Sequence, residues 1–178
     1  MPKTVRIVQN GESILRDKAL HVLVNEIGSE RIKKVIANMK AAMGAQKDGI
    51  AIAAPQIGEL FRIFIVNGHL LKQADKTYKG GTEDMVFINP EIIKKSRDKK
   101  EVEEGCLSVR WLYGKVRRST RVTLKAMDEK GQRLERGASG LLAQIFQHEA
   151  DHLEGILFTD KARELWEMSP EEIAELQK

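Results

Sequence analysis

The segment from Gly140 to Leu153, with the sequence GLLAQIFQHEADHL, constrains the fold of this chain more than any other feature. Its apolar residues recur at helical spacing, which predicts a helix with one buried face. Two histidines, His148 and His152, continue that face one turn apart, so both imidazoles can point at one ion. The remaining elements must therefore cover this helix on its apolar side.

The other segments predict an α+β fold, in which small antiparallel or mixed strands pack around this central helix. A first helix is expected from Ser29, its N-cap, to about Lys47. Residues 67–84 have the composition of a loop or insertion, and the strand before the next turn should end or bend near Pro90. Strands are expected at residues 60–66, 85–96, 101–109 and 121–139, the last with a turn around 129–131.

Length and composition predict one domain that spans residues 1–178. The hydrophobic content of 42% and charged content of 31% are ordinary for a globular protein. No apolar run is long enough to cross a membrane, and the first residues lack the apolar segment of a signal peptide. A cytoplasmic protein is therefore expected, or an organellar one whose targeting peptide is absent from this sequence.

The formal net charge of +4 comes from basic residues that are interleaved with acidic ones, as in KKSRDKKEVEEG. This pattern is typical of a solvated surface, and no nucleic-acid motif or membrane-binding stretch accompanies it. The charge is compatible with a weak attraction to ribosomes. It does not indicate a specific macromolecular partner.

His148, Glu149 and His152 form the pattern H-E-x-x-H, which is typical of a metal site with a glutamate beside a metal-activated water. The alternative is a chance pair of histidines on a helix face. A long zinc-protease pattern would add Gly155, which is present, and a third histidine, where Phe158 stands instead. That protease class is therefore excluded.

The end of the chain offers another source for the third ligand. Ser169 as N-cap, Pro170 at the first helical position and Glu172 in a capping box predict a short C-terminal helix. Glu171, Glu172 or Glu175 would be the ligand in a small metallopeptidase. Fewer than thirty residues follow the histidine motif, which leaves little room for a substrate cleft.

Cys106 is the remaining candidate, because His21 and His69 lie in polar, loop-like segments. As the only cysteine it makes no internal disulfide. Its polar neighbours Glu104 and Ser108 are unusual for a core cysteine, and Gly105 gives the backbone freedom beside it. An inert core residue is the plain alternative. A thiolate with two imidazoles would leave a fourth position open for water, which is typical of catalytic sites.

Such a site predicts hydrolysis of a carbonyl compound. Glu149 would take a proton from the activated water and later return it to the leaving group. The tetrahedral intermediate needs donors for its oxyanion, and the amide of Gln56 and the backbone N–H of Leu107 are candidates. Read without further context, Gln56 is an ordinary loop glutamine.

Three segments, taken in order, resemble the peptide deformylase family. They are GIAIAAPQ at 49–56, EGCLS at 104–108 and HEADH at 148–152, and the resemblance extends from about Val5 to Asp160. It implies removal of the N-formyl group from formylmethionine at the start of new polypeptides, with release of formate. The expected substrate is therefore a formyl-Met peptide or nascent chain.

The resemblance also implies the cofactor and the roles of site residues. It implies one divalent metal, Fe²⁺ as the native ion, while a site of this kind also suits Zn²⁺, Ni²⁺ or Co²⁺. Cys106, His148 and His152 would be ligands, Glu149 the general acid/base, and Gln56 with the Leu107 N–H the oxyanion site. Substrate contacts are expected from Ile50, Ala51, Val102, Gly105 and Ile145, with Leu141 as pocket or core, and a buried Glu104–Arg118 pair would steady the cysteine loop.

The chain departs from the family pattern around the substrate cleft. Ala51 replaces the second glycine of the first motif, Arg110-Trp111 stands where Pro-Glu is common, and Tyr113 replaces an arginine. These positions concern substrate contacts rather than the metal. An alternative to the enzyme is thus a catalytically impaired, metal-binding or ribosome-associated relative whose cleft is blocked by Ala51 and Trp111.

Overall fold

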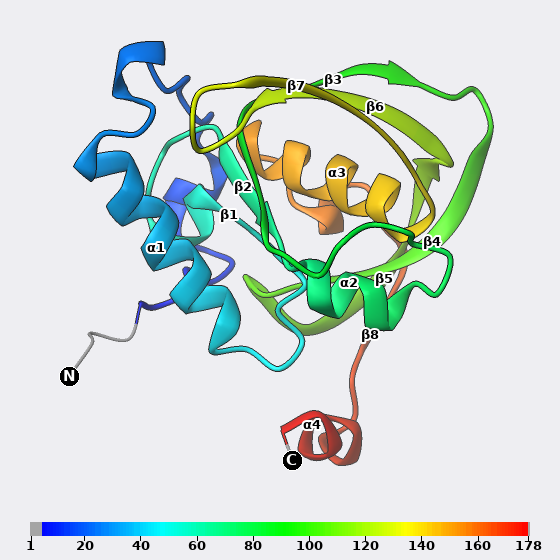
Figure 1. The fold of residues 1–178 in the computed structure, drawn as a ribbon. Coiled ribbons are helices and arrows are strands. Elements are labelled where there is room, and N and C mark those ends of the chain that lie inside the picture. Colours follow the sequence, from blue (N-terminus) through cyan, green and yellow to red (C-terminus); the bar gives the residue numbers. More distant parts are fainter. Residues whose placement is uncertain (1–4, 178) are drawn as a thin grey trace.

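The structure, a computed structural model, describes residues 5–177 (Figure 1). The expected domain also includes residues 1–4 and 178, which lie outside the described residues. The four α-helices of the described part are α1 (Glu30–Gly44), α2 (Gly68–Ala74), α3 (Gly140–Leu153) and α4 (Pro170–Gln177). The strands are β1 (Ala51–Ala53), β2 (Ile63–Val66), β3 (Met85–Lys95), β4 (Lys99–Cys106), β5 (Val109–Ser119), β6 (Arg121–Met127), β7 (Arg133–Ser139) and β8 (Arg163–Glu167).

The strands form two antiparallel sheets, which confirms the α+β class. Five strands pair in the order β1-β2-β3-β6-β7, and three pair in the order β4-β5-β8. The predicted bend in β3 coincides with a register shift between Ile88 and Glu91, where Asn89 has a φ of 51°. Asn89 holds this bend through two side-chain hydrogen bonds of 2.8 Å to the backbone of Val22.

Strand β2 is buried on both faces because helices cover both sides of the larger sheet. Ile63 and Ile65 pack in the cluster that α1 contributes to, whereas Phe64 and Val66 pack in the cluster of α3. The alternation of side chains along a strand accounts for this division. Buried segments of this kind show continuous apolar runs rather than polar alternation.

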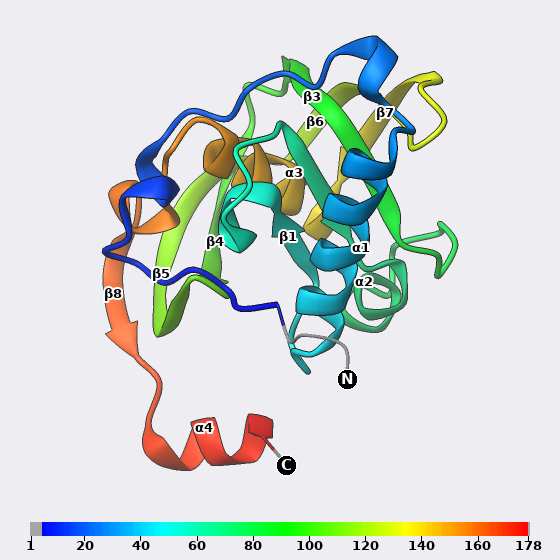
Figure 2. The same cartoon turned by 90° about the vertical axis from the view of Figure 1, so that its left-hand side faces the viewer.

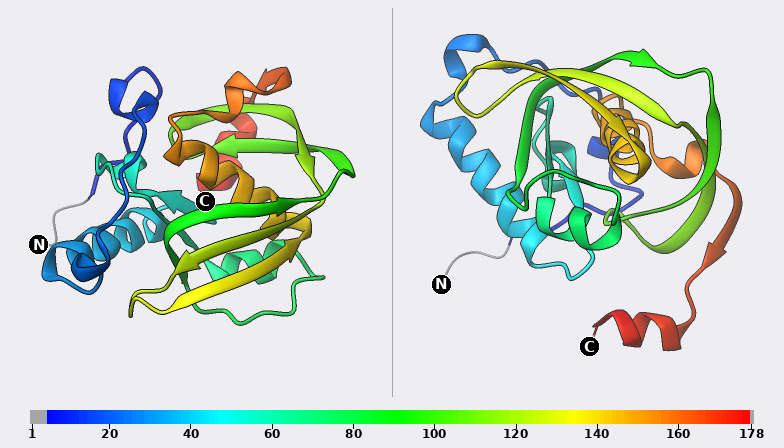
Figure 3. Two further views of the ribbon diagram at one scale, coloured as in Figure 1. Left: turned by 90° about the horizontal axis from the view of Figure 1, so that it is seen from above. Right: turned by 45° about the vertical axis from the view of Figure 1, so that its right-hand side comes forward.

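Helix α3 lies between strands of both sheets (Figure 3). Phe146 on α3 packs against Phe64 of β2 and Phe87 of β3, with ring centroids 5.8 and 5.1 Å apart. This aromatic cluster fixes the depth of the helix against the larger sheet. The polar end of α3, with His148 and His152, faces the β4–β5 hairpin, which belongs to the smaller sheet.

Both sequence-based helix starts that rest on capping are confirmed. The Ser29 hydroxyl accepts a hydrogen bond from the N–H of Ile32, and α1 ends at Gly44. Ser169 and Glu172 exchange the two hydrogen bonds of a capping box at the start of α4. Helix α4 lies at the periphery of the molecule, and none of its described residues is buried (Figures 1 and 2). A hydrogen bond of 2.9 Å from Lys47 Nζ to the carbonyl of Gln177 connects its end to the segment after α1.

The interpretation of residues 67–84 as a loop is wrong for its first part, which forms α2. The Asn67 side chain caps α2 by accepting a hydrogen bond from the N–H of Leu70, and Leu71 is fully buried. A seven-residue helix is marginal by itself, so its stability comes from this tertiary contact. Because the helix depends on a tertiary contact, its sequence does not need a strong helical pattern.

The strand expected at 101–109 is in fact a hairpin. Strand β4 ends at Cys106, and β5 begins at Val109 and pairs with it. Residues 110–119 and 163–167, which were not expected to form strands, make up most of β5 and all of β8. No helix in the described part of the chain is long and apolar enough to span a bilayer.

Candidate metal centre

The thiol of Cys106 and the imidazoles of His148 and His152 meet in space. One ligand atom from each lies within 4.8 Å of the others, and Cys106 Sγ lies 3.2 Å from His152 Nε2. Cys106 comes from the end of β4, and both histidines come from α3. A thiolate and two imidazoles are a donor set for a divalent transition metal, and three protein ligands leave a position open.

The β4–β5 hairpin holds Cys106 in place. The N–H of Ser108, a fully buried residue, points at Cys106 Sγ from 3.4 Å, as expected in a tight turn. Gly105 is required beside it because a Cβ at this position would lie 2.5 Å from the ring of Tyr113. The glycine therefore allows the aromatic ring to lie directly against the backbone of the cysteine loop.

Glu104 and Arg118 form a buried ion pair behind the metal ligands. Arg118 Nε and Nη2 lie 2.7 and 2.9 Å from the two carboxylate oxygens of Glu104, and the side chains are 5% and 2% exposed. Arg118 also pairs with Asp151 of α3 at 2.6 Å. Glu104 and Arg118 are therefore shielded from solvent, unlike the partners of an ordinary surface ion pair.

The same carboxylate orients one of the imidazoles. Glu104 Oε2 lies 2.9 Å from His148 Nδ1, so His148 directs Nε2 away from Glu104. Burial would raise the pKa of Glu104, but its hydrogen bonds to Arg118 and His148 lower that pKa to about 2. Glu104 thus stays ionised, as a carboxylate behind a metal-binding histidine commonly does.

The electrostatics favour an ionised cysteine. Burial would raise the pKa of the Cys106 thiol, but His152 and then His148 lower it to about 5. Burial would lower the pKa of His148, but its contacts with Cys106 and Glu104 raise it well above the usual value. The site thus stabilises a thiolate beside a positive charge. A bound divalent cation would supply that positive charge in place of a protonated imidazole.

Glu149 lies on α3 next to these ligands, and it lines the adjoining pocket. Its side chain is buried, and its Oε2 atom has no hydrogen-bond partner among the described residues. Burial raises the pKa of this carboxyl, while the two nearby histidines oppose the rise. A buried carboxylate oxygen without a partner is rare, and here it is a free proton acceptor inside the pocket.

Gln56 lies in a short 3-10 helix, Ala54–Ile57, and its amide orientation is fixed by three contacts. Its Oε1 accepts from the N–H of Ala53 at 2.8 Å. Its Nε2 lies 3.1 Å from Ser108 Oγ and 3.5 Å from Cys106 Sγ. The donor end of the amide is therefore turned toward the cysteine loop.

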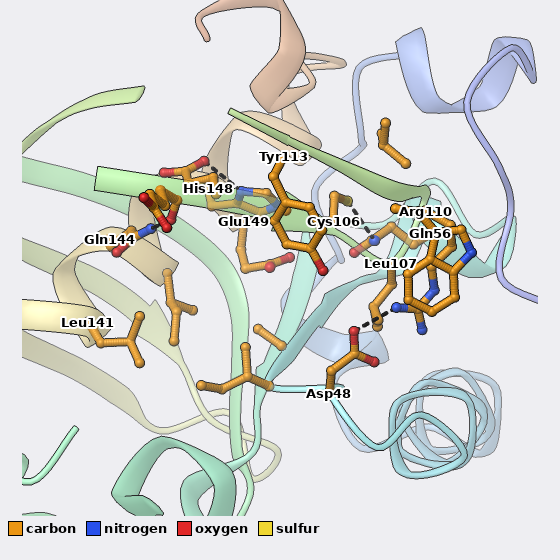
Figure 4. A pocket seen from close by; sticks show the side chains of 18 residues that line it. Asp48, Gln56, Cys106, Leu107, Arg110, Tyr113, Leu141, Gln144, His148 and Glu149 are labelled. Carbon is orange, nitrogen blue, oxygen red and sulfur yellow. Dashed lines mark hydrogen bonds and ion pairs between the residues drawn. The ribbon is translucent and has the colours of Figure 1, made fainter. Parts of the chain in front are cut away.

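A pocket of about 260 Å³ opens beside the three ligands (Figure 4). Of the residues expected to contact substrate, Ile50, Ala51, Gly105 and Ile145 line it, and so do Gln56 and Leu107. Leu141, which was expected as pocket or core, also lines it. The other lining residues are Asp48, Glu103, Glu104, Cys106, Val109, Arg110, Trp111, Tyr113, Gln144, His148 and Glu149.

Val102 is not among the residues that line this pocket, and its expected substrate contact stays a prediction. It is half-buried and pairs with Val116 across the β4–β5 ladder, outside the described lining of the pocket. Ala51 sits in extended backbone within β1, so its methyl group needs no unusual φ. Trp111 does have an unusual φ, of 67°, at the pocket rim.

Gln144 and Asp48 also line the pocket, although neither was expected there from the sequence. Gln144 precedes His148 by one helical turn, so helical spacing was a sufficient signal for it. No local pattern marks Asp48, which follows α1 in an irregular segment. Helix α4 carries the downstream glutamates and lies away from α3 (Figure 1). The group of possible metal ligands in the described structure contains Cys106 and none of these glutamates.

Comparison with known proteins gives consistent results. The model of a family described as polypeptide deformylase matches residues 4–167. A peptide deformylase from Pseudothermotoga lettingae is 40% identical over 161 residues, which cover 90% of this chain and 82% of that protein. The chloroplastic/mitochondrial peptide deformylase 1A of Arabidopsis thaliana is 40% identical over 162 residues, which cover 87% of this chain and 60% of that protein. The Met-Ala-Ser-bound crystal structure of a class I type b peptide deformylase from Acinetobacter baumannii aligns with a TM-score of 0.80 and 34% identity, covering 90% and 99% of the two chains.

Proposed function

Since this chain belongs to the peptide deformylase family, we propose specific roles in deformylation for the residues that meet at the pocket. The family's general function makes the protein a metal-dependent hydrolase of protein biosynthesis that removes the N-formyl group from peptides. The observation that carries the assignment of roles is the meeting of Cys106, His148 and His152 beside a buried, unpartnered Glu149 oxygen.

Cys106 Sγ, His148 Nε2 and His152 Nε2 would hold the metal. Fe²⁺ is the proposed native ion, and Zn²⁺, Ni²⁺ and Co²⁺ suit the same thiolate and imidazole donors. When bound, the metal supplies Lewis-acid chemistry to water and to the formyl carbonyl. The contact between His148 Nδ1 and Glu104 supports this ligand set, because it leaves Nε2 as the imidazole nitrogen that can bind a metal.

Glu149 acts as the general acid/base of the reaction. Its unpartnered Oε2 accepts the proton of the attacking water, and the raised pKa of this carboxyl favours return of the proton to the leaving amine. Burial in the pocket keeps the carboxyl away from bulk water, which would otherwise exchange that proton. Formate and a peptide with a free amino terminus are the products.

Gln56 and the backbone N–H of Leu107 form the oxyanion site. The Gln56 amide is held by Ala53 and Ser108, so its donor end is preorganised beside the cysteine loop. Fixed donors stabilise charge that develops in the transition state without paying for reorientation. Both residues line the pocket, next to the expected position of the formyl carbonyl.

The methionine side chain of the substrate occupies the apolar part of the pocket. Ile50, Ala51, Gly105 and Ile145 line this part, and Leu141 extends it. The solved Met-Ala-Ser complex of the related Acinetobacter protein supports a peptide that begins with methionine. The short side chain of Ala51 lets a peptide backbone approach β1 closely.

The domain organisation, the location and the contact with the ribosome are properties of the whole chain. We propose one domain over residues 1–178, organised around α3, which contacts strands of both sheets. A free cysteine as metal ligand suits the reducing cytoplasm, while an organellar location would resemble that of the Arabidopsis relative. Contact with the ribosome, where formylated chains emerge, is proposed from the substrate alone.

One experiment tests these roles together: formate release from a formyl-Met peptide, with metal analysis of the same sample. We expect turnover together with about one equivalent of metal per chain. Bound metal without turnover would instead favour a catalytically impaired relative. In a metallopeptidase with a downstream glutamate ligand, Cys106→Ser would keep the metal, whereas we expect this variant to lose it.

A further inference from the structure

A bridge of side chains that the chemistry of the metal centre does not require joins two segments at the edge of the pocket. Arg110 belongs to β5, on the same hairpin as Cys106, whereas Gln46 and Asp48 belong to the segment between α1 and β1. Arg110 Nη1 lies 2.7 Å from Asp48 Oδ2, and Nη2 lies 2.6 Å from Gln46 Oε1. Arg110, Asp48 and Gln46 together form a rim bridge.

The rim bridge joins two separate walls of the pocket. Arg110 and Asp48 both line it, and Figure 4 shows their contact as a dashed line, away from Leu141. Their side chains are 21% and 32% exposed, so the pair lies at the boundary between pocket and solvent. Arg110 also packs over the ring of Trp111, at 5.1 Å from its centroid, which further restricts the guanidinium.

The reaction makes this position significant. The formyl group has to reach Glu149 and the metal ligands, but the substrate is the beginning of a longer polypeptide. Its following residues must therefore leave the pocket through the mouth.

We propose that Arg110 is a specificity-determining residue, because the rim bridge has to open before residues beyond the formylated methionine can bind. This inference rests on the proposed function of the pocket. The free energy needed to open the rim bridge weakens the binding of longer peptides. It does not change the proton transfers at Glu149. A partly exposed ion pair with charge-assisted hydrogen bonds is expected to change such selectivity by about two- to fivefold.

The test compares formyl-Met amide with the tetrapeptide formyl-Met-Ala-Ser-Ala on the metal-loaded enzyme. In Arg110→Ala, kcat/KM for the tetrapeptide should rise by about two- to fivefold relative to formyl-Met amide, through a lower KM with kcat unchanged. Asp48→Ala should act in the same direction. The double variant should equal Arg110→Ala, because a bridge is lost once either end is removed.

Salt provides a readout that a purely structural role would not change. Raising the ionic strength screens the partly exposed pair, so wild-type selectivity should approach that of Arg110→Ala. Arg110→Ala itself should show no such salt dependence. The matched control is Lys115→Ala, which removes another ion pair of β5, the contact of 2.7 Å with Glu164. This pair lies outside the described pocket lining, so its loss should leave selectivity unchanged.

Two outcomes would overturn the proposal. A fall in kcat/KM for the tetrapeptide in Arg110→Ala would mean that the guanidinium binds the peptide rather than obstructing it. Unchanged selectivity in both single variants would mean that the bridge does not control access. The proposed function fails separately, if the wild type releases formate from neither substrate.

Discussion

At the scale of single residues, each side chain around the pocket is oriented by a second residue. Glu104 orients His148, and Ser108 and Ala53 hold the amide of Gln56. Glu149 Oε2 and His152 Nδ1 are the exceptions, because neither atom has a hydrogen-bond partner in the described structure. An oriented ligand set around one unsatisfied carboxylate is the arrangement that proton transfer requires.

Glu149→Gln should keep the metal but lose activity. The amide has nearly the same shape as the carboxyl, so the neighbouring ligands stay in place, but it cannot accept the proton of water. We expect kcat to fall by about 10²- to 10⁴-fold. Formate release and metal content measured on one sample check this, and robust turnover by the variant would contradict the role of Glu149.

Glu104→Gln should destabilise the fold and weaken metal binding. It leaves the buried guanidinium of Arg118 with one carboxylate fewer, at a cost of about 3–5 kcal/mol in the free energy of unfolding. Denaturant titration of the metal-free protein measures this cost. The control Lys115→Ala, at a largely exposed pair, should lose less than about 1 kcal/mol.

A second variant separates stability from metal binding at the same pair. Replacing Glu104 by Leu and Arg118 by Met together removes both buried charges and should recover most of the stability. Metal affinity should stay low, since His148 Nδ1 has then lost its carboxylate partner. Full metal affinity in this double variant would show that Glu104 does not orient the ligand.

At the scale of elements, the start of α3 is held from outside the helix. Its N-cap residue, Ser139, makes no side-chain capping hydrogen bond to the described residues. Instead, Asp75, which follows α2, accepts from the N–H of Leu141 at 3.2 Å. Gly140 is needed here, because its φ is 58° and a Cβ would meet Asp75 Oδ2 at 2.7 Å. The segment 67–84 thus provides a cap for the helix that carries both histidines.

Asp75→Ala should therefore destabilise the protein by about 1 kcal/mol, as expected when a helix cap is lost. Asp75→Asn is the matched control, because it keeps an oxygen acceptor and should lose only part of that amount. Thermal or denaturant unfolding of the two variants gives the comparison. Equal losses in both would point to the charge of Asp75 rather than to its hydrogen bond.

At the scale of the whole molecule, the metal site joins the two sheets. Cys106 ends a strand of the smaller sheet, and the histidines lie on the helix that packs against the larger one. A ligand that binds only the folded state stabilises it by mass action. The metal should therefore act as a bridge between the two parts of the fold.

Removal of the metal should lower the thermal midpoint. At a free metal concentration of about 1,000 times Kd the stabilisation is about 4 kcal/mol, which corresponds to a shift on the order of 10 °C for a chain of this size. Thermal unfolding with and without a chelator measures the shift. Cys106→Ser should show a much smaller shift, and an equal one would remove Cys106 from the ligand set.

The sequence by itself determined the features that depend on neighbours along the chain. The spacing of His148 and His152 on α3 and the caps at Ser29 and Ser169 are of this kind, because helical periodicity and capping act over three or four residues. The three ordered motifs also indicated the family.

Only the tertiary structure decided which distant residues meet. Cys106 and His152 are 46 positions apart, and Arg110 and Asp48 are 62 apart. The same holds for Asp75, whose carboxylate accepts a hydrogen bond at the start of α3. No local pattern encodes these pairs, because their contacts arise from sheet register and helix packing, which are settled only when the whole chain folds.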